Sequence, residues 1–214
     1  MFSSYIFKNI GGVDMYDIVE LGLLSKEQSD QAVGLFISGF GKFMTFSKDE
    51  ELKRKLYLKL FDSKLFLCYV EDGKVLGLMG LATNKKRPIC FYPEICREYF
   101  GQIKGTIISK QMNVVFQSPV VKDDDELYLD VLVTDSENRR KGVGTKLLNY
   151  AFDLEGYNVV YTEVFSRNEN AIRFYEKNGF IVDKEEKMSL LRFQGEGYPI
   201  KMKRERNRNG EHNS

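Results

Sequence analysis

Residues 127–153 read LYLDVLVTDSENRRKGVGTKLLNYAFD, and this stretch decides the fold. Its first part alternates apolar and other side chains, which is the period of a β-strand. Its last part repeats apolar residues at helical spacing, at Val143, Leu147, Leu148, Ala151 and Phe152. Gly156 supplies a stop signal for that helix. The stretch therefore predicts a strand, a glycine-containing turn and an amphipathic helix.

The turn between this strand and helix is suited to holding an anion. Gly142 and Gly144 let the backbone bend and approach a ligand closely. The N–H groups that open the helix point outward, and the helix dipole adds roughly half a positive charge there. Cationic side chains surround the turn, at Arg139, Arg140, Lys141 and Lys146. Because α/β sheets usually bind ligands at the carboxyl ends of strands, we expect a phosphate-bearing ligand here.

Two common phosphate-binding loops do not fit this turn. The dinucleotide fingerprint G-x-G-x-x-G requires a third glycine where the chain has Leu147. The P-loop requires Gly-Lys-Ser/Thr, whereas the chain reads Gly144-Thr145-Lys146. The pattern that remains is R-x-x-G-x-G, from Arg139 to Gly144.

A second motif follows at residues 163–180, which read EVFSRNENAIRFYEKNGF. Together with R-x-x-G-x-G it resembles, in order and spacing, the two halves of the acetyl-CoA site in the GNAT superfamily of N-acetyltransferases. The resemblance covers about residues 125–186. It implies an α/β fold of the GNAT acyl-CoA N-acyltransferase type, with a mixed central sheet flanked by helices. We expect a single GNAT domain over residues 1–203, followed by a disordered polar tail over residues 204–214.

The resemblance implies an acetyl-CoA-dependent N-acetyltransferase that moves acetyl from acetyl-CoA to a primary amine. The amine would attack directly in a ternary complex, and neither motif contains a cysteine that could form an acyl-enzyme. The acceptor would be a small-molecule or peptide amine, and the sequence does not choose among polyamines, aminoglycosides, amino acids and protein N-termini. A non-catalytic acyl-CoA-binding sensor module is the alternative.

The residues that would bind acetyl-CoA come from three places. The strand before the turn would offer its backbone to the pantetheine arm, the turn would hold the phosphates, and Asn168 would bind the pantetheine or cap the next helix. The implied cofactor-binding residues are Leu132, Val133, Thr134, Arg139, Arg140, Lys141, Gly142, Val143, Gly144, Thr145, Asn168 and Ala171.

Two residues take the catalytic roles that the resemblance implies. Tyr175 would donate a proton to the leaving thiolate, since a phenol is protonated at neutral pH; its alternative is a core aromatic. Glu163 would take the proton of the amine, with a solvated strand glutamate as its alternative. Asp130 is a rival base that could instead face solvent. An ordered water is a third candidate for the base.

Composition narrows the class of protein further. The formal net charge is +1, so no polyanionic partner such as nucleic acid is indicated. The three cysteines, Cys68, Cys90 and Cys96, fit a reducing cytoplasm. His212 is the only histidine, so a Cys/His zinc site is not expected. No apolar run reaches the ~20 residues that span a bilayer, so we expect no membrane partner and a cytoplasmic location.

Before the motifs, the pattern predicts a strand at Tyr5–Ile10, two helices and a hairpin. Ser25-x-x-Gln28 and Ser47-x-x-Glu50 read as capping boxes that start the helices. Asp72-Gly73 predicts a tight turn between strands Lys64–Val70 and Val75–Ala82. Strands are also expected at Tyr157–Phe165, Phe180–Glu186 and Tyr198–Met202. Of the aromatic residues in the first helical region, Phe36 and Phe40 are expected in the core, and Phe43 and Phe46 in the core or the acceptor pocket.

Residues 84–118 depart from the family pattern. In the family a short connection typically joins the third and fourth strands, whereas residues 84–118 form a long connection at this place in the chain. We expect a helical insertion near the acceptor entrance, with Glu94–Phe116 largely helical. Its apolar side chains could pack it on the core, at Tyr99, Phe100, Ile103, Ile107 and Ile108. A subunit contact that forms a homodimer is the alternative role for this segment, and a protein-interaction domain is the corresponding rival function.

Overall fold

A seven-stranded mixed sheet in the order β1-β2-β3-β4-β5-β7-β6 forms the centre of the fold. It is seen in a computed structural model that describes residues 16–138, 141–187 and 195–206. Neighbouring strands are antiparallel except β4 and β5, which run parallel. The strands are β1 (Tyr16–Glu20), β2 (Phe66–Glu71), β3 (Lys74–Ala82), β4 (Glu126–Thr134), β5 (Val159–Phe165), β6 (Ile181–Glu185) and β7 (Pro199–Glu205).

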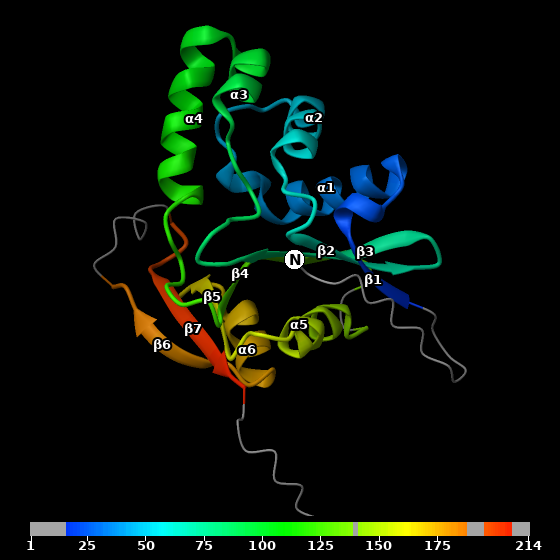
Figure 1. The fold of residues 1–214 in the computed structure, drawn as a ribbon, viewed down its shortest axis with the longest axis vertical. Coiled ribbons are helices and arrows are strands. Elements are labelled where there is room, and N and C mark those ends of the chain that lie inside the picture. The colour runs from blue at the N-terminus through cyan, green and yellow to red at the C-terminus, as the bar shows by residue number, and fades with distance from the viewer. Residues whose placement is uncertain (1–15, 139–140, 188–194, 207–214) are drawn as a thin grey trace, which may run out of the picture.

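Helices cover both faces of this sheet. They are α1 (Lys26–Phe40), α2 (Glu50–Leu60), α3 (Pro93–Phe100), α4 (Gln102–Phe116), α5 (Val143–Asp153) and α6 (Glu169–Lys177), with short 3₁₀ turns at η1 (Leu21–Leu23) and η2 (Gly41–Phe43). Helices α1 to α4 lie on one side of the sheet, and α5 and α6 lie on the other (Figure 1). The mixed sheet and its helix layers confirm the predicted fold class.

Each face of the sheet has its own apolar core. On the α1–α4 side, buried aromatic residues such as Phe36, Tyr57 and Phe91 pack over the sheet. On the α5–α6 side, Leu147 and Val160 belong to a second cluster that contains the middle of β4. The strand that we predicted from alternating apolar residues thus supplies both layers.

Several local predictions are confirmed and others shift. Ser25 and Gln28 form the predicted capping box of α1. Helix α2 instead begins after Asp49, whose carboxylate accepts a hydrogen bond from Leu52 N–H, so the box expected at Ser47 is wrong. Asp49 takes the N-cap position because Ser47 lies two residues before it and its hydroxyl accepts a hydrogen bond from the Asp49 N–H.

The ends of the described chain also differ from expectation. Strand β1 is present at the sheet edge although its short sequence gave no clear strand pattern. The strand expected at Tyr5–Ile10 lies outside the described residues. Strand β7 continues through Arg204 and Glu205, so the tail does not begin at residue 204. Arg204 is held by Asn178 O and by the ring of Phe152, and residues 207–214 lie outside the described residues.

The predicted helical insertion is confirmed as the hairpin of α3 and α4. Gly101 breaks the helix at φ 78°, and Gly105 lets the two helices touch, since a Cβ there would lie 2.4 Å from Cys96 O. Ile108 is buried, but Ile103 is 80% exposed and Ile107 is 50% exposed. These two isoleucines therefore do not attach the insertion to the core as expected.

Gly77 on β3 sets how closely α5 approaches the sheet. A Cβ at this position would lie 2.6 Å from Val143 Cγ1 and 2.9 Å from Leu147 Cδ1. We predict that Gly77→Ala lowers the free energy of unfolding by about 1–3 kcal/mol, because overpacking forces the helix outward. Urea unfolding measures this, with Gly41→Ala as the control, since its Cβ would make only an ordinary 3.6 Å contact. Equal stability of the two variants would contradict the packing assignment.

Candidate active site

Strands β4 and β5 are paired over only about half of their length and then diverge. Their pairing runs from Glu126 opposite Val159 to Leu129 opposite Thr162 and then stops, although both strands continue. On its other edge β4 carries one extra residue, Asp130, between the pairs that join Val131 and Leu129 to β3. Such a bulge bends a strand. The parting leaves backbone groups of β4 beyond Leu129 without a partner strand on the β5 side.

A cleft of about 1090 Å³ occupies this parting. Its volume is at the upper end of ligand sites, which are roughly 300–1,000 Å³. Eleven of the predicted site residues, from β4, β5, α5 and α6, line this cleft. They are Leu132, Val133, Thr134, Gly142, Val143, Gly144, Thr145, Glu163, Asn168, Ala171 and Tyr175. The two sequence motifs therefore meet in space.

The four predicted basic residues of the turn have a different outcome. Arg139 and Arg140 lie outside the described residues. Lys141 is described but does not line the cleft, and its ammonium donates to Asn138 Oδ1 at 2.7 Å. Lys146 is turned away from the glycine turn, over the ring of Tyr16 at 3.9 Å. The expectation that Lys146 surrounds the phosphates is therefore wrong, because the aromatic side chains of β1 and β2 hold it instead.

The glycine turn is ordered by the residue that follows β4. The carboxylate of Asp135 accepts hydrogen bonds from the N–H groups of Glu137 and Asn138, at 3.0 and 3.1 Å. Gly142 then adopts the left-handed conformation, with φ 79° and ψ 4°, and α5 starts at the next residue. Among the described residues, no side chain caps this helix. A Cβ on Gly142 would meet no atom of this described part of the chain within 4 Å, which leaves space beside the first N–H groups.

Tyr175 lies on α6 and is 7% exposed. Its ring packs edge-on against Phe174 and Phe180, so the core-aromatic reading describes its surroundings correctly. Tyr175 nevertheless lines the cleft. Burial raises the pKa of its phenol to about 12, and a side-chain hydrogen bond with Thr162 acts in the opposite direction. The phenol is therefore protonated at neutral pH and able to donate.

Glu163 lies on β5 and points to the opposite face of the sheet from its buried neighbour Val164. The Glu163 side chain lines the cleft and is exposed to solvent there. The pKa of its carboxyl is raised, first by desolvation and then by the negative charges of Glu186 and Asp130, while the positive charges of Lys201 and Arg87 lower it. Within the described ranges no cation forms an ion pair with Glu163.

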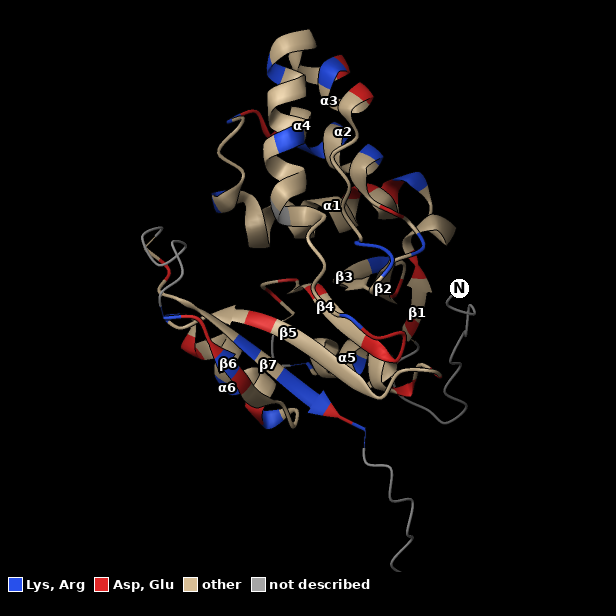
Figure 2. Ribbon diagram, turned by 60° about the vertical axis from the view of Figure 1, so that its left-hand side comes forward, with Lys and Arg blue, Asp and Glu red and all other residues tan. Residues whose placement is uncertain are grey.

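The nearest lysine to Glu163 in the sheet is its cross-strand partner Lys201 on β7. Basic residues run along this strand (Figure 2). The Lys201 ammonium lies over the Tyr161 ring at 4.1 Å and donates to Val120 O at 3.4 Å. Because Lys201 is occupied elsewhere, the Glu163 carboxylate stays available to the cleft.

Asp130, the rival base, also lines the cleft but is bound by a guanidinium. Arg87 donates to both carboxylate oxygens, at 2.8 and 2.7 Å, and the two side chains are 9% and 10% exposed. The expectation that Asp130 faces solvent is wrong, since strand alternation breaks down at a bulge. Both oxygens of the Asp130 carboxylate therefore already accept hydrogen bonds from Arg87. Of the two carboxylates, that of Glu163 forms no ion pair within the described ranges.

Asn168 is confirmed as a helix cap. Its side-chain oxygen accepts a hydrogen bond from Ala171 N–H at 3.2 Å and so starts α6. The same residue lines the cleft, so the two readings of Asn168 are compatible.

One end of the cleft is crossed by contacts that the sequence did not reveal. Phe43 of η2 stacks on Phe165 of β5 with ring centres 5.9 Å apart. Beside them, Lys42 pairs with Glu196 at 2.8 Å. Phe40 packs against the core and stacks on Phe36, as expected, and it also lines the cleft. The position of Phe43 agrees with the pocket alternative given for it from the sequence, whereas its partner Phe165 and the Lys42–Glu196 pair join segments far apart in the chain and were not predicted.

The remaining sequence predictions on the site are less directly tested. Phe46 packs among Tyr57, Phe91 and Phe100 and not in the cleft. No described residue of 84–118 lines the cleft, and the position of the insertion near the acceptor entrance stays a prediction. Among the described residues, no cluster of three or more His, Cys, Asp or Glu could hold a metal ion. Within the same ranges, no helix has the length and apolar character to cross a bilayer.

A sheet that opens beside a glycine-led helix defines a class of α/β proteins that bind an extended, phosphate-bearing ligand at the switch between strands. The chain belongs to the acetyltransferase (GNAT) family, whose model matches residues 36–180. No curated protein sequence matches the chain.

Solved structures share the fold at low sequence identity. Ard1 from Thermoplasma volcanium superposes with a TM-score of 0.53 and 18% identity, over 89% of this chain and 97% of that chain. A GNAT-family acetyltransferase from Bacillus cereus superposes with a TM-score of 0.54 and 16% identity, over 91% of this chain and 99% of that chain. A structure of the NatC complex bound to Gag peptide and CoA gives 0.54 and 16%, also over 91% and 99%. At these identities the likeness establishes the fold alone.

The left-handed Gly142 gives a direct test of the phosphate-binding turn. We predict that Gly142→Ala weakens binding of CoA, because a left-handed alanine costs about 1–2 kcal/mol and the added methyl group enters the open space. Isothermal calorimetry with CoA measures this. The control is Gly156→Ala, which carries the same strain at φ 88°, also in open space but after α5. An unchanged dissociation constant for Gly142→Ala would remove this turn from the binding site.

Proposed function

We propose that this protein transfers the acetyl group of acetyl-CoA to a primary amine by direct attack in a ternary complex. The proposal rests on one observation, the convergence of the glycine-led helix start, the parted strands, Tyr175 and Glu163 in a single cleft. Family membership supports acyl transfer from acetyl-CoA, and the cleft supports the roles of the residues.

The residues present fit acetyl-CoA. The open space beside Gly142 and the uncapped amides of α5 suit a diphosphate. The β4 segment from Leu132 to Thr134, with no partner strand on the β5 side, suits a peptide-like pantetheine arm. Lys141, Val143, Gly144 and Thr145 complete the proposed turn, together with Arg139 and Arg140, which lie outside the described residues.

Acetyl-CoA, when bound, supplies an acetyl thioester. In the proposed reaction the amine nitrogen forms a bond to the acetyl carbon, and the bond from that carbon to sulfur breaks. Glu163 takes the proton that the amine loses, directly or through a water molecule. Tyr175 gives its proton to the leaving sulfur, for which its raised pKa keeps it ready.

The two proposed catalytic residues approach from opposite faces of the sheet. Tyr175 belongs to the core on the α5–α6 side, whereas Glu163 alternates with the residues of β5 that face that core. Both line the same cleft, because the strands have parted. The amine can therefore approach from the Glu163 side while the thioester lies toward Tyr175, and no cysteine is needed between them.

The acceptor is proposed to be a small-molecule or peptide amine that enters near Phe43 and Phe165. The proposal includes a cytoplasmic location, since Cys68, Cys90 and Cys96 are all free thiols. A homodimer through residues 84–118 stays a prediction. A non-catalytic acyl-CoA sensor is the second candidate function, and it would not need an unpaired carboxylate or a protonated phenol in the cleft.

Release of free thiol from acetyl-CoA across a panel of amines separates the two candidate functions. The panel should contain polyamines, aminoglycosides, amino acids and peptides with free N-termini. Thiol release that depends on one acceptor class supports the enzyme. Tight binding of acetyl-CoA without thiol release for any acceptor would support the sensor.

Glu163 should control the pH dependence of the reaction. As a base it must be ionised, so kcat/KM should fall as the pH drops through its pKa, which lies above the usual range of a glutamate. We predict that Glu163→Gln lowers kcat/KM and abolishes this acidic limb. The matched control is Glu176→Gln, on an exposed part of α6. A Glu163→Gln profile that keeps the limb would assign the base to a water molecule or another group.

Tyr175 should affect turnover more than binding. We predict that Tyr175→Phe reduces kcat by about 100- to 10,000-fold, the usual contribution of a general acid, with nearly unchanged affinity for acetyl-CoA. Tyr161→Phe is the control, because its phenol donates to Glu126 on the other face of the sheet. Steady-state kinetics and calorimetry decide, and wild-type turnover by Tyr175→Phe would exclude the proton-donor role.

A further inference from the structure

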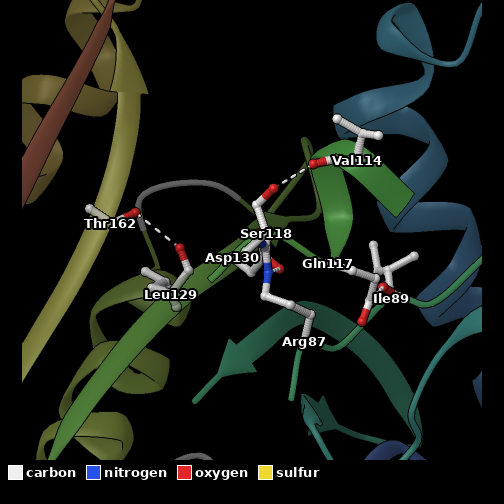
Figure 3. Close-up of polar contacts among 8 residues, drawn as sticks. All are labelled: Arg87, Ile89, Val114, Gln117, Ser118, Leu129, Asp130 and Thr162. Atoms are coloured by element: carbon white, nitrogen blue, oxygen red, sulfur yellow. Dashed lines mark hydrogen bonds and ion pairs between the residues drawn. The ribbon is translucent and has the colours of Figure 1, made fainter. Parts of the chain in front are cut away.

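Arg87 connects three points of the chain near the place where β4 and β5 part (Figure 3). Its Nε and Nη2 atoms donate to the two carboxylate oxygens of Asp130, at 2.8 and 2.7 Å. Its Nη1 atom donates to the carbonyl oxygen of Ser118 at 2.9 Å. Arg87 and Ser118 stand at the two ends of the α3–α4 insertion, so one guanidinium joins both ends of the insertion to the bulge of β4.

The contact is buried and geometrically demanding. The side chains of Arg87 and Asp130 are 9% and 10% exposed, in contrast to the other ion pairs of the described chain, which are more open to solvent. A planar guanidinium can satisfy both carboxylate oxygens and a carbonyl together, whereas a lysine ammonium acts as a point charge. The ends of the insertion are also joined by Gln117, whose side chain donates to Ile89 O at 2.7 Å.

Asp130 is the residue next to the parting of the strands. One position earlier, the Leu129 carbonyl accepts a hydrogen bond from Thr162 Oγ1 at 3.2 Å, at the last pair between β4 and β5 (Figure 3). Two positions later begins the segment Leu132–Thr134 that lines the cleft. The last contact with β5, at Leu129, and the ion pair with Arg87, at Asp130, thus involve successive residues of β4. Together they fix the direction in which β4 diverges from β5.

We propose that Arg87 is a positioning residue that holds the β4 edge of the cleft open for acetyl-CoA, and that the 84–118 insertion serves the active site by carrying it. This inference rests on the proposed function. It gives the insertion a role although no insertion residue lines the cleft: its two ends meet at the guanidinium, and the guanidinium fixes Asp130.

The same pair also balances charge beside Glu163. Desolvation is the main cause of the raised pKa of the Glu163 carboxyl, and four charged neighbours also act on it: Glu186 and Asp130 raise it, while Lys201 and Arg87 lower it. Removing Arg87 alone would leave Asp130 negative and uncompensated, and both effects raise the pKa of Glu163. Removing both charges, as in the double variant Arg87→Met with Asp130→Asn, removes one group that lowers the pKa of Glu163 and one that raises it, so the net change in that pKa should be small.

The test compares Arg87→Met, Arg87→Lys and Lys59→Met with the wild type. Lys59 is a matched control, because its ion pair with Glu98 at 2.6 Å also ties the insertion to the body of the protein, but at α2 and away from β4. Calorimetry with CoA gives affinity, steady-state kinetics gives KM for acetyl-CoA and kcat, and circular dichroism confirms that each variant is folded at the temperature used.

We expect Arg87→Met to weaken CoA binding and raise KM for acetyl-CoA by about 10- to 100-fold, the scale of a small misplacement at an active site. Arg87→Lys should recover thermal stability, since Asp130 stays compensated, but only part of the affinity. Lys59→Met should match the wild type. The acidic limb of kcat/KM should move to higher pH in Arg87→Met and return toward the wild-type position in the double variant.

Other outcomes would overturn the inference. A folded Arg87→Met with wild-type affinity and KM would show that the pair only stabilises the fold, as would full recovery of affinity by Arg87→Lys. Equal weakening by Lys59→Met would show that any attachment of the insertion suffices. If Arg87→Met does not fold, Asp130→Asn, which keeps the shape of the pair, is judged by the same criteria. A wild-type protein that binds no CoA would instead refute the proposed function and the inference with it.

Discussion

The parting of β4 from β5 is the constraint on which the rest of this structure depends. Two parallel strands pair for four residues and then diverge, because β4 carries an extra residue at Asp130 and bends away. Backbone N–H and C=O groups left without a partner strand are costly unless water or a ligand satisfies them. A sheet that opens in its middle is therefore suited to receive a peptide-like ligand, and the cleft lies at that opening.

Other features of the fold maintain this opening. Gly77 lets α5 pack directly on β3, which brings the uncapped start of the helix to the open end of the sheet. On the opposite side, Arg87 compensates the buried charge of Asp130 and joins it to the ends of the insertion. The opening also explains how Tyr175 and Glu163, which belong to two faces of one sheet, line a single cleft, since a continuous sheet would separate them.

The sequence allowed correct predictions where local rules decide the structure. Alternation at Leu127–Val133, the glycine turn at Gly142 and the helical repeat after it all appear as expected. Predictions were wrong where a distant partner decides. Asp130 was a rival base or a solvent-facing charge, and the structure instead pairs it with Arg87, 43 positions earlier in the chain. Lys146 was expected beside the phosphates, but it lies over the ring of Tyr16. Nothing in the spacing of these residues indicates their partners.

By itself, the sequence determined the fold class, the place of the glycine turn and eleven of the residues that line the cleft, because period, turn chemistry and motif spacing act over short stretches of chain. Only the tertiary structure decided which carboxylate of the cleft is bound by a guanidinium, which aromatic residues line the cleft, and what the insertion touches. Those properties depend on burial and on contacts between distant residues, such as Phe43 with Phe165 and Lys42 with Glu196. The packed sheet brings these residues together, and no local sequence pattern indicates their contact.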